Sequence, residues 1–197
     1  LSAGRLILGV GAGGDWNREL SAFGEEADRS VRAEMLDEGL ALIESLWSGA
    51  EVEHVGRHYV ARSVRFLPQP VQWPRIPVWV GALWPNTRSI ERAAHWDGVF
   101  PILSGGPRKP IEPDQVRAVV ASVAAKRRRI GQTLDGFEVV VQGRTRSLPP
   151  EEALRRCNDF AEAGVTWWLE VIEPDEPAET IRRWIGRGPC CSRSMAY

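Results

Sequence analysis

Short apolar runs alternate with segments of helical periodicity along this sequence, and the alternation limits the folds open to the chain. Each run has the length of a buried strand and is followed by a helix pattern. The expected strands lie at residues 6–10, 78–80, 98–102, 137–142 and 166–172. The expected helices lie at residues 28–47, 89–96, 113–130, 150–163 and 177–185. This order predicts an α/β fold with a parallel sheet and right-handed crossovers, in about five β/α units.

The composition is that of a globular chain with room for one full core. Of its 197 residues, 43% are hydrophobic and 26% are charged. The net charge of −1 gives no general attraction to nucleic acid or to an anionic membrane. No apolar run approaches the roughly 20 residues of a membrane span. We therefore expect no nucleic-acid partner and no membrane partner.

The three cysteines are too few for a disulfide framework. Cys157 falls in a helical pattern and is expected to be a small core residue, while Cys190 and Cys191 are adjacent near the end of the chain. We infer a reducing, cytoplasmic setting. The chain opens with Leu1-Ser2-Ala3-Gly4, which is typical of a turn inside a larger protein.

The first apolar run ends in closely spaced glycines, which indicate a ligand site because a ligand can lie against bare main chain there. Gly9, Gly11 and Gly14 fit the G-x-G-x-x-G fingerprint of dinucleotide-binding folds. That fingerprint needs a helix directly after its last glycine and an acidic residue about 20 positions on. Here residues 15–27 are loop-like and Glu34 falls inside a helix. A Rossmann-type site and glycines with a purely structural role are both open at this point.

An insertion of about residues 50–77 separates the first helix from the second strand. A small hairpin is expected from Val52 to Val60, turning near Gly56. The prolines between Pro68 and Pro74 exclude a central strand and predict an ordered connector. The next strand is expected to end at Gly81. Residues 187–197 are expected to form a disordered tail.

Few polar side chains form a catalytic pattern. On the last strand, Glu170 is expected to pair with an inward arginine such as Arg144, because a carboxylate on an apolar strand is costly unless it is paired. A substrate role is the alternative. His54 and His58 flank the hairpin turn and are expected to pair across it, and no metal site is predicted. The run Lys126-Arg127-Arg128-Arg129 is expected to complement a helix dipole.

Several short motifs follow one another in a fixed order. They are Ser2-Ala3-Gly4-Arg5, Leu6-Ile7-Leu8-Gly9-Val10-Gly11-Ala12-Gly13, Phe23-Gly24, Arg29, Leu36-Asp37-Glu38, Leu46-Trp47, Gly56-Arg57-His58-Tyr59, Pro68-Gln69-Pro70, Ile76-Pro77-Val78-Trp79-Val80-Gly81 and Ala93-Ala94-His95-Trp96-Asp97-Gly98. Together they resemble the bacterial luciferase-like superfamily of flavin- or deazaflavin-dependent oxidoreductases. The resemblance covers about residues 1–186.

The resemblance implies a TIM-barrel fold of the (β/α)8 type. This chain would hold the fourth to eighth β/α units as one partial barrel domain, with residues 50–77 as an insertion. The first strand would be the fourth strand of the barrel. Because a full barrel needs about 250 residues, the resemblance implies a fragment, an incomplete gene product or a degenerate member.

The resemblance also implies an activity. The chain is expected to be an oxidoreductase or monooxygenase that uses reduced FMN or coenzyme F420 for hydride transfer to, or oxygenation of, a small organic substrate. The expected cofactor-binding positions are Gly11, Gly13 and Asn17 beside the ring, and Gly81, Ala82 and Asn86 near the phosphate-bearing tail. Trp16, Trp84 and Glu170 are expected to line the substrate pocket.

Two alternatives remain beside that activity. The first is a catalytically inactive fragment or non-catalytic subunit, and the less favoured second is a Rossmann-type nucleotide-binding domain. For the assembly we expect a homodimer or a partner chain that completes the barrel.

Overall fold

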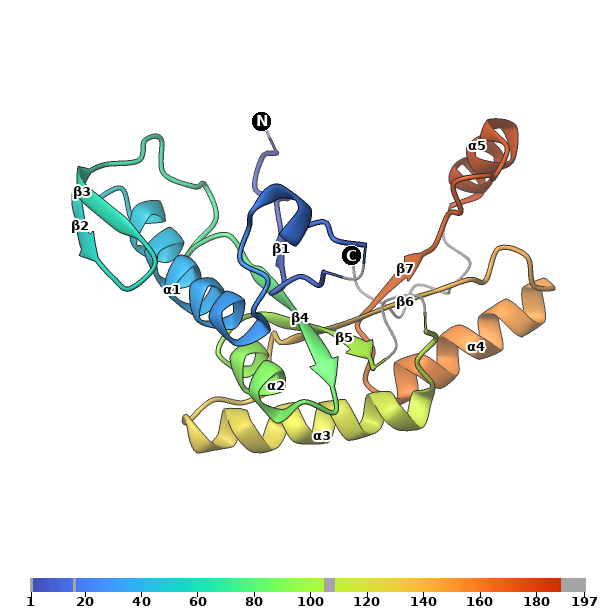
Figure 1. The fold of residues 1–197 in the computed structure, drawn as a ribbon. Coiled ribbons are helices and arrows are strands. Elements are labelled where there is room, and N and C mark those ends of the chain that lie inside the picture. The colour runs from blue at the N-terminus through green and yellow to red at the C-terminus, as the bar shows by residue number, and fades with distance from the viewer. Residues whose placement is uncertain (1, 16, 105–108, 189–197) are drawn as a thin grey trace. The chain divides into compact units, whose positions relative to one another are not determined.

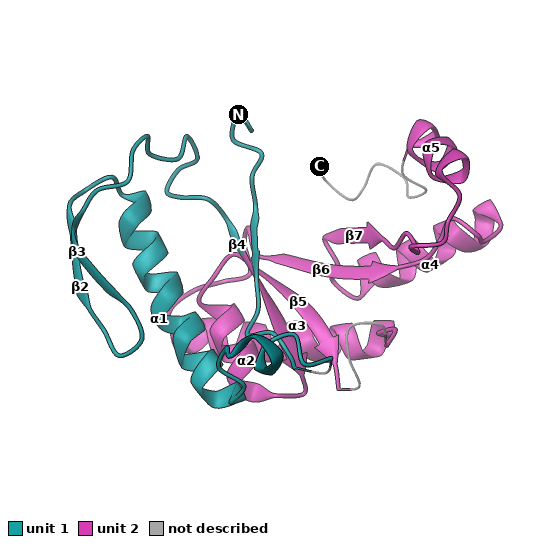
Figure 2. Cartoon of the chain, turned by 45° about the horizontal axis from the view of Figure 1, so that its top comes forward, with its two compact units in different colours: residues 1–78 teal, residues 79–197 magenta. Residues whose placement is uncertain are grey.

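The computed structural model describes residues 2–15, 17–104 and 109–188. The chain divides into two compact units, residues 1–78 and residues 79–197, coloured separately in Figure 2. Along the chain, five strands (β1, β4, β5, β6 and β7) are each followed by a helix, with a hairpin inserted after the first helix. The predicted order of strands and helices is therefore confirmed.

Unit 1 begins with a short strand and a long helix. Its elements are β1 (Leu8–Val10), the 3-10 helix η1 (Ser21–Phe23), α1 (Arg29–Trp47), β2 (Val52–Val55) and β3 (Val60–Val64). The carboxylate of Asp28 caps α1 by accepting hydrogen bonds from the backbone N–H groups of Ser30 and Val31, at 2.7 and 3.1 Å. After the helix, Gly49 takes a φ of 68°, which favours glycine. The expected helix at residues 28–47 is confirmed.

The hairpin that follows α1 is antiparallel, with His54 opposite Ala61 and Val55 opposite Val60. The N–H of Gly56 donates to the carbonyl of Tyr59 at 2.9 Å and closes the turn, as expected. The second strand runs on to Val64, four residues past the expected end. Glu53 accepts a hydrogen bond from the Ser63 N–H at 2.9 Å near that end.

Unit 2 is built on parallel strands with a helix after each. Its elements are β4 (Val78–Trp84), whose first residue belongs to unit 1, α2 (Thr87–Ala94), β5 (Gly98–Leu103), α3 (Pro113–Arg129), β6 (Glu138–Gly143), α4 (Pro150–Glu162), β7 (Trp167–Glu170) and α5 (Ala178–Arg187). The strands pair in the order β4-β5-β6-β7, all parallel. Helices α2, α3 and α4 lie on one face of this sheet (Figure 1). The predicted parallel α/β arrangement is confirmed.

Along each strand, successive side chains point to opposite faces, so this sheet has one face covered by helices and one opposite face. The ring of Trp168 meets Phe160 of α4 at 5.1 Å, so Trp168 lies on the helix-covered face. Register places Val80 on the same face, where it is fully buried. On the opposite face, Trp79 meets Trp167 at 5.1 Å in an edge-to-face contact.

Cys157 lies in α4 and is 1% exposed, so its expected place in the core is confirmed. The other two cysteines lie outside the described residues. Among the described residues, no helix is long and apolar enough to cross a membrane.

Candidate functional site

The glycine loop, residues 11–14, follows β1 in unit 1 and leaves its main chain accessible. A Cβ atom added at Gly9 or at Gly11 would meet no other atom within 4 Å, and neither residue has a positive φ. The chain's own packing therefore does not require glycine at these two positions, and the space beside them is available to a ligand. Gly13 has a φ of 68°, so the turn itself favours glycine at that position.

The Rossmann fingerprint requires a helix directly after Gly14, and the described residues that follow Gly14 do not form one. The first helical turn is η1 at Ser21–Phe23, and α1 begins at Arg29. Asp15 ties this segment together, because its carboxylate accepts hydrogen bonds from the backbone N–H groups of Leu20 and Ser21, at 2.8 and 3.1 Å. Hydrogen bonds from Ser21 and Leu20 hold the pKa of Asp15 below its usual value.

Two expected site residues belong to the same segment. Asn17 is exposed and turned toward Glu19, with its backbone N–H and its Nδ2 each 3.1 Å from a Glu19 carboxylate oxygen. This contact is local, so the side chain of Asn17 is not locked into the core. Trp16 lies outside the described residues.

Arg32, on the first turn of α1, reaches back to this loop. Its Nε donates to the carbonyl of Ala12 at 2.9 Å, and its Nη1 donates to the carbonyls of Glu26, at 3.1 Å, and Ala27. Sequence reasoning missed this residue. The only local signal is an arginine one turn into a helix that follows a long polar loop, and that signal does not say which carbonyls the arginine meets.

In unit 2, the carboxyl ends of the four parallel strands meet at one edge of the sheet. The strand expected to end at Gly81 runs on to Trp84, so the expected end of the strand is wrong. The backbone of Ala82 lies opposite Pro101 in the ladder, and its side chain is fully buried. At the edge itself, the Ser104 hydroxyl donates to the carbonyl of Trp84 at 3.3 Å.

Asn86 follows β4 and starts the next helix. Its Oδ1 accepts a hydrogen bond from the Ser89 N–H at 3.1 Å and caps α2. The Ser89 hydroxyl donates in turn to the carbonyls of Leu83 and Asn86, each at 2.9 Å. Asn86 therefore has a fixed orientation at the edge where β4 ends.

Glu170, at the end of β7, is satisfied by neutral donors. Its carboxylate accepts from the N–H and hydroxyl of Thr145, at 2.6 and 2.7 Å, from the Arg146 N–H at 2.9 Å and from the Trp168 indole N–H at 3.0 Å. The expected pairing with Arg144 is wrong, because Arg144 pairs with Glu173 instead. Glu170 thus fastens the loop after β6 to the end of β7.

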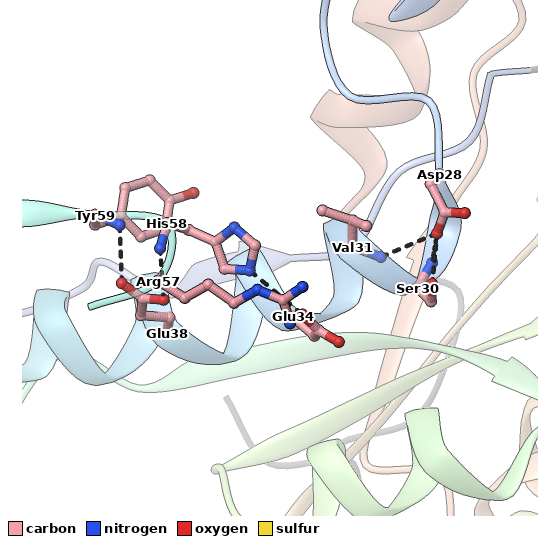
Figure 3. Close-up of polar contacts among 8 residues, drawn as sticks. All are labelled: Asp28, Ser30, Val31, Glu34, Glu38, Arg57, His58 and Tyr59. Carbon is pink, nitrogen blue, oxygen red and sulfur yellow. Dashed lines mark hydrogen bonds and ion pairs between the residues drawn. The ribbon is translucent and has the colours of Figure 1, made fainter.

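The two hairpin histidines meet carboxylates of α1 rather than each other. His54 Nε2 lies 3.0 Å from Glu38, and His58 Nε2 lies 3.5 Å from Glu34. Glu38 also accepts from the N–H groups of His58 and Tyr59, at 3.0 and 2.8 Å, as Figure 3 shows. The expected pairing across the hairpin is therefore wrong. In the described part of the chain, no three metal-ligating side chains come together.

The profile of the family described as luciferase-like monooxygenase matches residues 1–183. The chain belongs to this family. Two curated relatives are F420-dependent glucose-6-phosphate dehydrogenases, from Nocardia farcinica (strain IFM 10152) and Microbacterium testaceum (strain StLB037). They are 27% and 32% identical over 95% and 94% of this chain. These alignments cover 62% and 61% of the relatives, so this luciferase-like chain spans about three fifths of their length.

The fold of this luciferase-like chain is shared with solved structures at low sequence identity. The crystal structure of monooxygenase RslO1 from Streptomyces bottropensis matches with a TM-score of 0.74 at 20% identity, covering 92% of this chain and 66% of that one. A structural likeness at this identity shows the fold alone. The expected family and fold are thus confirmed.

Proposed function

We propose that this chain is part of a luciferase-like oxidoreductase whose cofactor is F420 or reduced FMN. The proposed substrate is a small organic molecule. Support comes from the family match and from the F420-dependent relatives, which favour F420 over FMN. When bound, such a cofactor supplies the hydride chemistry, and the protein binds, orients and shields it.

The observation that carries the proposal is the open space beside the glycine loop. A Cβ atom at Gly11 would meet none of the described residues, so we propose that the loop receives a flat ring against its backbone. Gly13 gives the loop its turn through a positive φ. Asn17, exposed and only locally bonded, is the proposed polar contact from the same loop.

In unit 2 the proposed contacts come from the carboxyl edge of the strands. Asn86 is fixed through its Oδ1, and we assign its Nδ2 as a donor to a ligand at this edge of unit 2, taken by itself. Gly81 and Ala82 lie within β4, the strand that leads to Asn86, and would help to hold Asn86 in place. Trp84 is the proposed wall of the substrate pocket. Glu170 is already engaged by four hydrogen bonds, which favours a structural over a substrate role.

A fluorescence titration of the chain with F420 and with FMN tests this function. We expect saturable binding of at least one cofactor. The Gly11→Val variant is expected to bind at least about tenfold more weakly, because its side chain fills space that the fold leaves open. Its stability to urea is expected to stay within about 0.5 kcal/mol of the wild type, because the position is exposed and an added Cβ meets none of the described residues.

The matched control is Gly186→Val in α5, where an added Cβ also meets nothing within 4 Å. This variant is expected to bind both cofactors like the wild type. Titrations that show no binding of either cofactor by the wild type would contradict the proposed function. Equal affinity of the wild type and Gly11→Val would remove the glycine loop from the proposed site.

A non-catalytic subunit, completed by another chain, is the second candidate. The observation that favours it is the exposure of large apolar side chains on both units, among them Trp73 at 92% and Ile185 at 70%. A completing chain would cover side chains of this kind. Its test is the oligomeric state of the chain.

A further inference from the structure

The glycine loop has almost no side chains with which to hold its own conformation. Residues Gly11-Ala12-Gly13-Gly14 carry nothing larger than a methyl group. Glycine-rich backbone loses more conformational entropy on ordering than other backbone does. A loop of this composition that binds a ligand tightly must therefore be ordered by groups outside it.

Arg32 is the side chain that provides such a tie. The hydrogen bond from its Nε reaches Ala12, in the middle of the loop, and those from its Nη1 reach Glu26 and Ala27, just before the cap of α1. One guanidinium thus joins the beginning and the end of the segment between β1 and α1. Hydrogen bonds from a charged donor are stronger than those between neutral groups.

The charge of Arg32 acts on the same segment. Asp15 and Asp28 have lowered pKa values, chiefly through hydrogen bonds from Ser21 and Ser30, with a further lowering by the positive charge of Arg32. Both carboxylates hold backbone N–H groups of the segment or of the first turn of α1. The charge of Arg32 therefore adds a small favourable interaction with both carboxylates, beside its hydrogen bonds to the segment.

We propose that Arg32 is a positioning residue for the cofactor. Through the Ala12 carbonyl it holds the glycine loop in the conformation that receives the ring, and so it raises the affinity for the cofactor. This inference rests on the proposed function. A role limited to starting α1 would leave the loop and the affinity unchanged when Arg32 is replaced.

The test compares Arg32→Met and Arg32→Lys with Arg29→Met, an exposed arginine of the same helical turn that serves as the control. Amide hydrogen exchange of residues 11–15 and 20–27 reports the order of the loop, and fluorescence titration with F420 and FMN reports the affinity. For Arg32→Met we expect exchange at least about tenfold faster and binding at least about tenfold weaker. Arg32→Lys is expected to show exchange rates and affinities between those of the wild type and Arg32→Met. Arg29→Met is expected to match the wild type in both.

The outcomes separate the inference from the proposed function. Unchanged exchange in Arg32→Met, or faster exchange with wild-type affinity, would overturn the positioning role and leave the proposed function in place. A loss of affinity of the same size in Arg29→Met would also overturn it, because the effect would then be one of charge alone. If the wild type binds neither cofactor, the proposed function fails and the inference fails with it.

Discussion

Arg127 is a buried cation on α3 that serves as a hydrogen-bond donor to backbone carbonyls. It is 9% exposed and donates to the carbonyls of Ala94 and Trp96, at 2.9 and 3.1 Å, and to that of Thr133. Burial lowers the pKa of its guanidinium. The residue thereby donates to the last carbonyl of α2, that of Ala94, and to the carbonyl of Trp96 just past the helix.

Replacing Arg127 by Met is expected to lower the free energy of unfolding by about 1–3 kcal/mol, because the carbonyls that it serves lose a donor. Urea denaturation followed by circular dichroism measures the change. Arg128→Met, at an exposed position next to it, is the control and is expected to stay within about 0.5 kcal/mol of the wild type. Equal losses in the two variants would mean that the helix dipole, and not the carbonyl contacts, sets the stability.

The sequence does not distinguish these two arginines. The basic run at residues 126–129 predicts only a favourable interaction with the end of its own helix. Which of them is buried depends on how α2 packs against α3. The same limit applies to Glu170, because strand alternation correctly predicts a carboxylate that needs partners, but not that those partners are Thr145, Arg146 and Trp168.

At the scale of elements, the β2–β3 hairpin is fastened to α1 by a carboxylate. Hydrogen bonds from His54 and from the backbone N–H groups of Tyr59 and His58 lower the pKa of Glu38 from 4.5 to about 2. The group favours the folded state fully above pH 4.5, its unfolded value, and this contribution is lost as the pH falls toward 2. The attachment of the hairpin is therefore expected to weaken on acidification through that range.

The Glu38→Gln variant tests this attachment. The wild type is expected to take up about one more proton on unfolding between pH 4.5 and 2 than the variant does, seen as a steeper fall of the urea midpoint with decreasing pH. Glu51→Gln, at an exposed position before the hairpin, is the control and is expected to follow the wild type. Parallel pH profiles for wild type and Glu38→Gln would show that the carboxylate does not hold the hairpin.

Most elements could be predicted from the sequence because their signals are local. Asp28 starts α1 and Gly49 follows its end, and both are recognised within one turn of helix. β4 was predicted too short because Gly81 looks like a strand end, whereas ladder pairing to β5 extends the strand to Trp84. The partners of His54 and His58 were missed because Glu38 and Glu34 precede them by 16 and 24 residues, a distance that only folding closes.

At the scale of the whole molecule, the exposed apolar side chains bear on whether the chain acts alone. In unit 1, Phe23 is 82% and Trp73 is 92% exposed, and in unit 2 Ile185 is 70% exposed on α5, none of whose described side chains is buried. Isolated exposed side chains are common in soluble proteins. The second candidate, a subunit completed by another chain, predicts that a partner covers these side chains.

We accordingly expect the chain to associate in a concentration-dependent manner, which sedimentation velocity measures directly. Association should weaken in Trp73→Ser if unit 1 carries the contact and in Ile185→Ser if α5 carries it, because a serine removes most of the apolar area that a partner would bury. Arg183→Ser, an exposed polar position on α5, is the control and is expected to associate like the wild type. A monomer at every concentration would argue against self-association. The second candidate would then require a different chain as the partner.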